Sequence, residues 1–195
     1  MTTVTREVWI NAPVEEVWAL LADFGNIYLF NPNVPKSYLT SSQQQGVGTT
    51  RHCDLNVAGA SIEERIVDWQ EGKSMTIDIY EGKKSPPFKT ALATIRVASE
   101  KGGTKVTGTL EYKMKFGPVG SLMDVAMVKP QFGKAWSLLF AGLKHYAETG
   151  EEINGETRPQ LSRCCHKRPL SSHHTSRQTQ LPKSLTDDVK LVMLR

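Results

Sequence analysis

Residues 117–150 read GPVGSLMDVAMVKPQFGKAWSLLFAGLKHYAETG, and they decide how the rest of the chain is arranged. Pro118 suits a first helical turn because its missing N–H would have no partner there, and Gly150 is a residue type that often ends a helix. Pro130 removes one backbone hydrogen bond, which predicts a kink or break between Val128 and Lys129. Apolar side chains recur every three or four residues, which predicts one long amphipathic helix with a buried stripe. The stripe comprises Leu122, Val125, Val128, Phe132, Trp136, Leu139, Leu143 and Tyr146.

The residues just before this helix alternate strictly between two faces. Residues 104–116 place Val106, Gly108, Leu110, Tyr112 and Met114 on one side. Lysine, threonine and glutamate occupy the other side, which is typical of a strand with one buried face. A half-buried strand that leads into a long helix is therefore the unit on which the other elements must pack.

The chain before residue 104 predicts further strands and two short helices. A first strand covers residues 3–11, and Pro13 then opens a helix whose first turn holds Glu15 and Glu16, where the helix dipole favours carboxylates. A second short helix is expected at residues 27–30. Strands are expected at residues 36–42, 48–55, 60–69, 75–79 and 88–97. The sequence predicts an α+β fold in which a seven-stranded, curved antiparallel sheet wraps around the long helix.

Charge and composition divide the chain near residue 154. Residues 1–155 carry 16 Lys and Arg against 17 Asp and Glu, whereas residues 156–195 carry 8 against 3. We therefore expect a folded domain over residues 1–153 and a basic tail of low order over residues 154–195. Because the folded part has no net positive charge, a nucleic-acid partner is not expected. A basic tail could instead contact acidic lipid or partner surfaces, although its charge is diffuse.

Cysteine usage and the N-terminus bear on location. The chain has Cys53 and the adjacent Cys164 and Cys165, which is no disulfide framework and favours a reducing compartment. The N-terminal residues lack an apolar signal core, and no run of 18 apolar residues is present. The expectation is a cytoplasmic protein without a transmembrane segment.

Several motifs in this order resemble the START-like superfamily, also called SRPBCC, which includes birch-pollen-type allergens and polyketide cyclases. The segment Ile10-Asn11-Ala12-Pro13-Val14-Glu15-Glu16-Val17-Trp18 resembles the opening pattern I-x-A-P-x-x-x-V-W of that superfamily. Gly48 to Arg51 resembles its G-x-x-R position, and Glu64-Arg65 its E-R position on a neighbouring strand. Gly102 to Val106 resembles its turn into the last strand, and Leu143 to Glu148 its L-K-x-x-x-E helix end. Two departures are Phe30, where tryptophan is common, and Pro130 within the helix.

The resemblance implies a helix-grip fold, in which a curved sheet grips a helix and leaves a hollow that holds an apolar small molecule. The residues themselves favour the same interpretation. Ala60, Ala91, Ala93 and Gly108 take inward positions on the strands, and such small side chains do not fill a core as leucine would.

Glu64 is the most informative candidate site residue. It shares a face with Ile62 and Ile66, so alternation points its carboxylate into the interior, where an unpaired charge is costly. One hypothesis makes Glu64 a polar anchor or general acid/base in the cavity. The favoured hypothesis is an ion pair with Arg51 on the adjacent strand. Arg65 is expected to face solvent.

Aromatic and apolar residues on inward faces complete the predicted site. Tyr112 and Trp136 each combine apolar surface with one hydrogen-bond donor, which suits an oily ligand carrying an oxygen, but they could equally be core residues. Methionines can give a pocket an adaptable lining. The predicted ligand-binding set is Phe30, Arg51, Glu64, Ile77, Ile79, Ala93, Tyr112, Met114, Met127, Phe132, Trp136 and Leu139, with Glu64 and Tyr112 as weak catalytic candidates.

Two functions follow from these patterns. The first is a binding protein that encloses a hydrophobic or aromatic small molecule, such as a lipid or a polyketide-like compound. The alternative is a polyketide cyclase or dehydratase that uses Glu64 or Tyr112 to move protons. No cofactor is expected, since no phosphate loop or nucleophile elbow is present. Cys164, Cys165, His166, His173 and His174 are too closely adjacent for a tetrahedral zinc site, so no metal is expected either.

Overall fold

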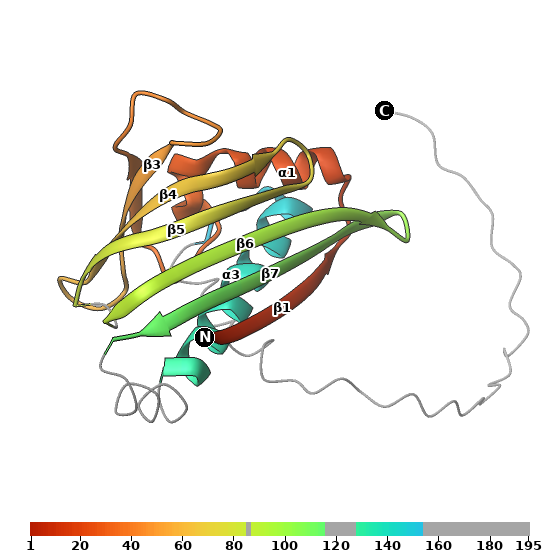
Figure 1. The fold of residues 1–195 in the computed structure, drawn as a ribbon. Coiled ribbons are helices and arrows are strands. Elements are labelled where there is room, and N and C mark those ends of the chain that lie inside the picture. Colours follow the sequence, from red (N-terminus) through yellow and green to blue (C-terminus); the bar gives the residue numbers. More distant parts are fainter. Residues whose placement is uncertain (85–86, 116–127, 154–195) are drawn as a thin grey trace, which may run out of the picture.

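The computed structural model describes residues 1–84, 87–115 and 128–153, and these form a curved sheet with helices on its concave side (Figure 1). The sheet has seven antiparallel strands in the order β1-β7-β6-β5-β4-β3-β2. The strands are β1 (Thr2–Ile10), β2 (Lys36–Leu39), β3 (Thr50–Asp54), β4 (Ser61–Gln70), β5 (Ser74–Lys83), β6 (Phe88–Glu100) and β7 (Gly103–Met114). The helices are α1 (Val14–Ala22), the 3₁₀ helix η1 (Phe24–Leu29) and α3 (Lys129–Thr149). The predicted fold class and strand number are confirmed.

The alternation expected in the last strand is present in β7. Val106, Leu110 and Tyr112 are buried, whereas Lys105, Thr107 and Glu111 are partly exposed. β6 and β7 meet in a tight turn in which Lys101 and Gly102 have φ values of 53° and 77°. Two consecutive positive φ values are what the twist of a two-residue hairpin requires. β6 and β7 thereby form a long ribbon that supports α3.

The described helix α3 starts at Lys129, which is where the sequence predicted a kink or break. Pro130 lies in its first turn, where the missing N–H has no intrahelical partner to lose. Residues 116–127, which carry the first part of the predicted stripe, lie outside the described residues. Gly150 ends the helix in the left-handed conformation, as predicted.

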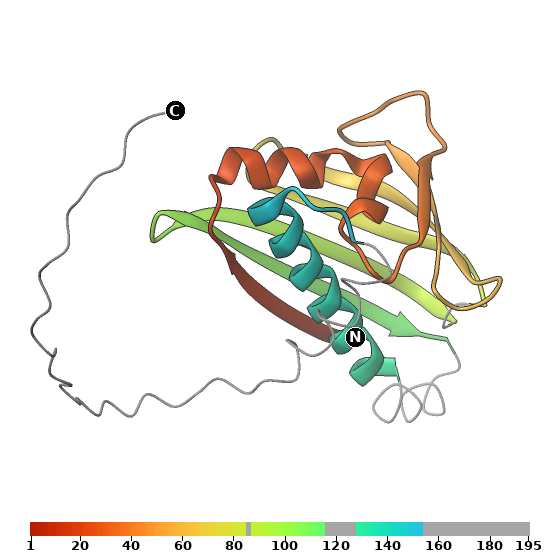
Figure 2. The same ribbon diagram turned by 180° about the vertical axis from the view of Figure 1, so that it is seen from behind.

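Two glycines allow α3 to approach its neighbours closely. A Cβ atom on Gly108 of β7 would lie 1.8 Å from Cζ3 of Trp136, so the indole packs directly on the backbone of the sheet. A Cβ atom on Gly142 would lie 1.9 Å from the carbonyl oxygen of Phe30. Seen from behind, α3 crosses the concave face with α1 near its C-terminal end (Figure 2). The C-terminal half of α3 is therefore held tightly on both sides.

A carboxylate fastens α1 to the sheet. Glu71, in the β4–β5 turn, accepts hydrogen bonds from Nε1 of Trp18 at 2.7 Å and Nε1 of Trp69 at 2.8 Å. The two indole rings lie 5.0 Å apart. This contact closes the end of the sheet at which α1 lies.

Candidate functional site

A cavity of about 450 Å³ lies between the concave face of the sheet and the first half of α3. Its floor comes from β3 to β7, its roof from α3, and its rim from the η1–β2 and β3–β4 connections. Eight of the predicted ligand-binding residues lie in its wall: Arg51, Glu64, Ile77, Ile79, Ala93, Phe132, Trp136 and Leu139. Most of this wall is apolar, which is typical of small-molecule sites. The interior is therefore partly vacant in the region where α3 and the sheet diverge.

One ion pair supplies the strongest polarity inside this wall. Nε of Arg51 lies 2.6 Å from Oε2 of Glu64, and the two side chains are only 5% and 9% exposed. Arg51 also donates through Nη1 to the carbonyl oxygen of Phe24 at 2.8 Å, and its guanidinium lies 3.8 Å from the centre of the Phe24 ring. The ion pair predicted from the strand pattern is present.

The pair has a definite electrostatic state. Burial alone would lower the pKa of Arg51, but the adjacent Glu64 carboxylate outweighs it, so the pKa of Arg51 is raised and the guanidinium stays charged. Cys53 lies next to the pair, with Sγ 3.5 Å from Oε2 of Glu64. Burial, assisted by the charge of Glu64, raises the pKa of the Cys53 thiol, which therefore stays protonated and unreactive.

Both partners of the ion pair already use some of their polar atoms. Oε2 of Glu64 lies 2.6 Å from Nε of Arg51. The hydrogen bonds of the pair use Nε and Nη1 of Arg51 and Oε2 of Glu64. The arrangement suits recognition of a polar group better than proton transfer.

Among the described residues, three of the predicted ligand-binding residues are not part of the cavity wall. Tyr112 is fully buried, and its ring lies 5.4 Å from the Phe88 ring and 5.5 Å from the Phe132 ring, so these two aromatics separate it from the space. Phe30 is buried against Tyr146, with ring centres 6.3 Å apart. Met114 lies at the end of β7 outside the wall, and Met127 lies outside the described residues. Alternation identifies the inward face of a strand, but it does not say which inward residue another ring covers.

Sequence reasoning missed much of the rim. The further wall residues are Ile27, Asn31, Asn33, Val34, Leu55, Asn56, Val57, Ala60, Ile62, Lys84, Phe88, Ile95, Leu110, Gln131 and Ala135. Asn33 ties the η1–β2 connection to α3, because its Nδ2 donates to the carbonyl oxygen of Ala135 at 2.9 Å. The backbone N–H of Asn56 donates to the carbonyl oxygen of Asn33 at 3.1 Å. Asn31, Pro32 and Asn33 directly follow the short helix expected at residues 27–30, and nothing in their sequence marks them as part of a cavity wall.

A separate polar cluster lies on the outer face, behind the ion pair. Nδ1 of His52 contacts Glu63 of β4, and Nε2 of His52 lies 3.1 Å from Asp54. The imidazole stacks on Tyr38 of β2 at 5.1 Å. The hydrogen bond to Glu63, against a smaller opposing effect of burial, raises the pKa of His52. His52 of β3 thereby contacts side chains of both neighbouring strands, Glu63 on β4 and Tyr38 on β2.

A second depression of about 450 Å³ lies between η1 and β2. Its lining is mainly polar and includes Asp23, Asn26, Gln44 and Gln45. Neither partner of the ion pair is among its lining residues. We therefore assign the candidate site to the cavity beneath α3.

Neither a metal cluster nor a membrane-spanning helix is found among the described residues. In residues 1–84, 87–115 and 128–153, no group of three or more His, Cys, Asp or Glu side chains is placed to hold a metal ion. In the same part of the chain, no helix combines the length and apolarity needed to cross a bilayer. The cysteine and histidine residues of the tail, for which zinc was considered, lie outside the described residues.

A curved antiparallel sheet, a long C-terminal helix across it and an apolar hollow between them define a helix-grip protein of the START-like class. The chain belongs to the polyketide cyclase / dehydrase and lipid transport family, whose model matches residues 1–148. A comparison with curated protein sequences finds no match.

Solved structures share this fold at low sequence identity. A START superfamily protein from Mycobacterium smegmatis is 15% identical with a TM-score of 0.60, covering 74% of this chain and 96% of that one. The structure of TTHA0849 from Thermus thermophilus is 21% identical with a TM-score of 0.62, covering 75% and 97%. The protein Ara h 8.0201 is 14% identical with a TM-score of 0.61, covering 75% and 97%. These likenesses confirm the fold that the sequence motifs implied.

Proposed function

We propose that this protein binds a hydrophobic small molecule, such as a lipid or a polyketide-like compound, in the cavity beneath α3. The observation that carries the proposal is a space of about 450 Å³ with a mostly apolar wall and one buried ion pair. Removal of apolar ligand surface from water supplies about 25 cal/mol for each Å² buried. The family description, which names lipid transport, supports the same class of ligand.

The ion pair gives the ligand a preferred orientation. Nη2 of Arg51 can donate a hydrogen bond, and Oε1 of Glu64 can accept one. A hydroxyl group both donates and accepts, so it can satisfy both atoms at once. We therefore expect a ligand with a long or fused apolar body and a hydroxyl at the end that reaches the pair.

The family description also names cyclases and dehydrases. For this chain an enzymatic role would require a proton donor or acceptor in the cavity wall. Glu64 is committed to Arg51, and Tyr112 lies behind Phe88 and Phe132. These contacts favour binding over acid–base catalysis by the two residues that the sequence suggested.

Cavity filling tests the proposal. Ala93, on β6, faces the cavity, whereas Ala98 is exposed on the same strand. We expect Ala93→Phe to abolish retention of a co-purifying small molecule in native mass spectrometry, while Ala98→Phe retains it as the unchanged protein does. Because a vacant space can accept the ring, Ala93→Phe should fold with nearly unchanged stability. A loss of about 1–3 kcal/mol, the usual cost of overpacking, would show that the space is filled by protein.

A further inference from the structure

The cavity opens to solvent at one end of the molecule. Val57, Lys84 and Gln131 are exposed members of the cavity wall, and they mark its mouth. The β3–β4 connection meets the β5–β6 turn there, because Nζ of Lys84 donates to the carbonyl oxygen of Ala58 at 3.0 Å. The start of α3 joins them through Phe132, whose ring lies 5.5 Å from that of Phe88.

Exposed lysines surround this mouth. They lie at the end of β5 and just after it, in the first residues of β6, at the end of β7 and just after it, and at the first residue of α3: Lys83, Lys84, Lys89, Lys113, Lys115 and Lys129. Backbone contacts keep these segments together, since Lys113 is paired with Thr90 and the N–H of Lys115 donates to the carbonyl oxygen of Pro87 at 2.9 Å. Within the described part of the chain, none of the six lysines forms an ion pair with a carboxylate.

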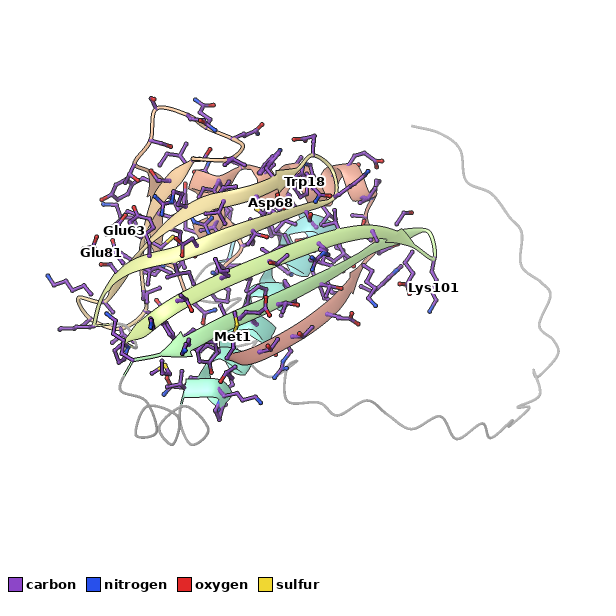
Figure 3. All side chains as sticks on the ribbon, viewed as in Figure 1. Met1, Trp18, Glu63, Asp68, Glu81 and Lys101 are labelled. Atoms are coloured by element: carbon purple, nitrogen blue, oxygen red, sulfur yellow. The ribbon has the colours of Figure 1, made fainter. Side chains whose placement is uncertain are left out.

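The rest of the surface does not share this charge. Residues 1–155 are nearly neutral overall, so six lysines at one end require an acidic remainder. Carboxylates on or beside the mouth strands are Glu63, Glu81 and Glu111, and Glu63 contacts His52. Figure 3 places Glu63 and Glu81 at this end and Lys101 at the far end of the sheet. Lys101 lies beside Glu100, with 3.6 Å between their charged atoms. The mouth is therefore a local basic surface.

An apolar tip projects among these lysines. Val57 is 62% exposed on the β3–β4 connection, although it also borders the cavity. Ile62, Ile79 and Phe88 are partly buried just behind it in the cavity wall. An exposed apolar side chain at the centre of a basic ring is the arrangement by which a surface enters the headgroup region of an anionic bilayer.

We propose that this mouth docks on an anionic lipid bilayer, with the six lysines at the headgroups and Val57 in the interface, so that the cavity opens towards the acyl chains. This docking is a separate property from ligand binding. It rests on the proposed function in one respect, because it makes the bilayer the source of the bound ligand. The chain's own residues 156–195 are not the occupant, because their 8 basic and 3 acidic residues have the same sign as the mouth. An acidic protein surface would pair with the lysines but would give the exposed Val57 no apolar interface to enter.

Vesicle partitioning of the full chain tests the proposal. The probes are vesicles of phosphatidylcholine alone and vesicles that also contain phosphatidylserine, separated from free protein by flotation. The variant Lys83→Gln/Lys113→Gln removes two charges at the mouth without altering the cavity wall. The matched control, Lys73→Gln/Lys101→Gln, removes two exposed charges from the opposite end. Both retain the basic tail, so any tail contribution is the same.

We expect preferential binding to the phosphatidylserine vesicles. Each lysine near an anionic surface contributes about fivefold, so the mouth variant should bind about 30-fold more weakly, whereas the control should remain within about twofold. Val57→Asp should also weaken vesicle binding. Equal losses in the mouth and control variants, or no binding of the full chain, would overturn the proposal. So would Val57→Asp binding vesicles as well as the full chain does, because that result would show that Val57 does not enter the interface.

The two proposals fail separately. Ligand retention is read by native mass spectrometry, and docking is read by flotation. A protein that retains a small molecule but ignores anionic vesicles lacks the docking surface. A protein that binds the vesicles through the mouth but retains no small molecule keeps its docking surface and loses the proposed function.

Discussion

The ion pair between Arg51 and Glu64 gives the sharpest prediction for stability. In Arg51→Met, the Glu64 carboxylate loses the guanidinium that lies 2.6 Å away while its side chain stays 91% buried, the complement of its 9% exposure. Breaking one partner of a buried pair costs about 3–5 kcal/mol, because the remaining charge is uncompensated. For a chain of this size, each kcal/mol lowers Tm by about 2–4 °C. Arg51→Met should therefore unfold roughly 10 °C below the unchanged protein.

Restoring the balance should recover most of this loss. In Arg51→Met/Glu64→Leu both charges are absent, and such replacements by apolar residues are often neutral or stabilising. The matched control is Arg65→Met, one residue from Glu64, which removes an exposed guanidinium 3.3 Å from Asp78. An exposed pair is worth about 0–1 kcal/mol, so the control should change little.

Urea unfolding at neutral pH of Arg51→Met, Glu64→Leu and the double variant completes a double-mutant cycle with the unchanged protein, and Arg65→Met is the external control. The cycle should give a coupling free energy of at least about 2 kcal/mol between Arg51 and Glu64. A loss below about 1 kcal/mol for Arg51→Met would refute the reasoning, because it would mean that water or another group solvates Glu64. A double variant as unstable as Arg51→Met would also contradict it.

Two further predictions concern packing and pH. Gly108→Ala places a Cβ atom 1.8 Å from Cζ3 of Trp136, so the indole must move and thermal unfolding should show a loss of about 1–3 kcal/mol or more. The pKa of folded His52 is raised, mainly by its hydrogen bond to Glu63, so its contribution is fully present below its unfolded pKa of about 6.5 and is lost as pH rises through the folded value. His52→Gln should therefore destabilise the protein most in acid solution, and urea titrations at about pH 5.5 and about pH 8.5 measure the difference.

Each of these predictions has a contrary outcome. Thr109→Ala changes the neighbouring residue on the other face of β7 and should have a small effect, so an equal loss in both variants would remove the special role of Gly108. A destabilisation by His52→Gln that does not depend on pH would show that the imidazole acts through stacking on Tyr38 and not through its charge.

The sequence was sufficient for the architecture because alternation and helical periodicity report which face of an element is buried. Glu64 shows that strand alternation can also predict the partner of a buried side chain. Its inward position and its pairing with Arg51 were both predicted from strand parity, and both are present despite a register shift between Glu63 and Glu64. Parity survives because the inward face of β4 is buried, so slipping the strand by one residue would expose its apolar set.

The remainder of the site depends on three-dimensional neighbours that no local pattern records. Tyr112 and Phe132 are both inward residues, yet Phe132 borders the cavity and Tyr112 lies beneath it. The rim residues Asn33 and Asn56 belong to connections without periodicity, and their role comes from contacts with α3 and with each other. Pro130 marked the Val128–Lys129 boundary in the sequence, because proline is disfavoured inside a helix, and α3 starts at Lys129.

The close packing of Gly142 against the backbone of Phe30 limits which ligands the cavity can bind. With 1.9 Å between a would-be Cβ atom and the carbonyl oxygen, that half of α3 acts as a fixed pivot. A guest larger than the resting space must therefore be accommodated by tilting the opposite end of the helix outward. The resistance to this tilt includes the hydrogen bond from Asn33 to Ala135, worth about 1 kcal/mol. The hydrogen bond from Asn33 to Ala135 is therefore one of the contacts that limit the size of the ligand that the cavity accepts.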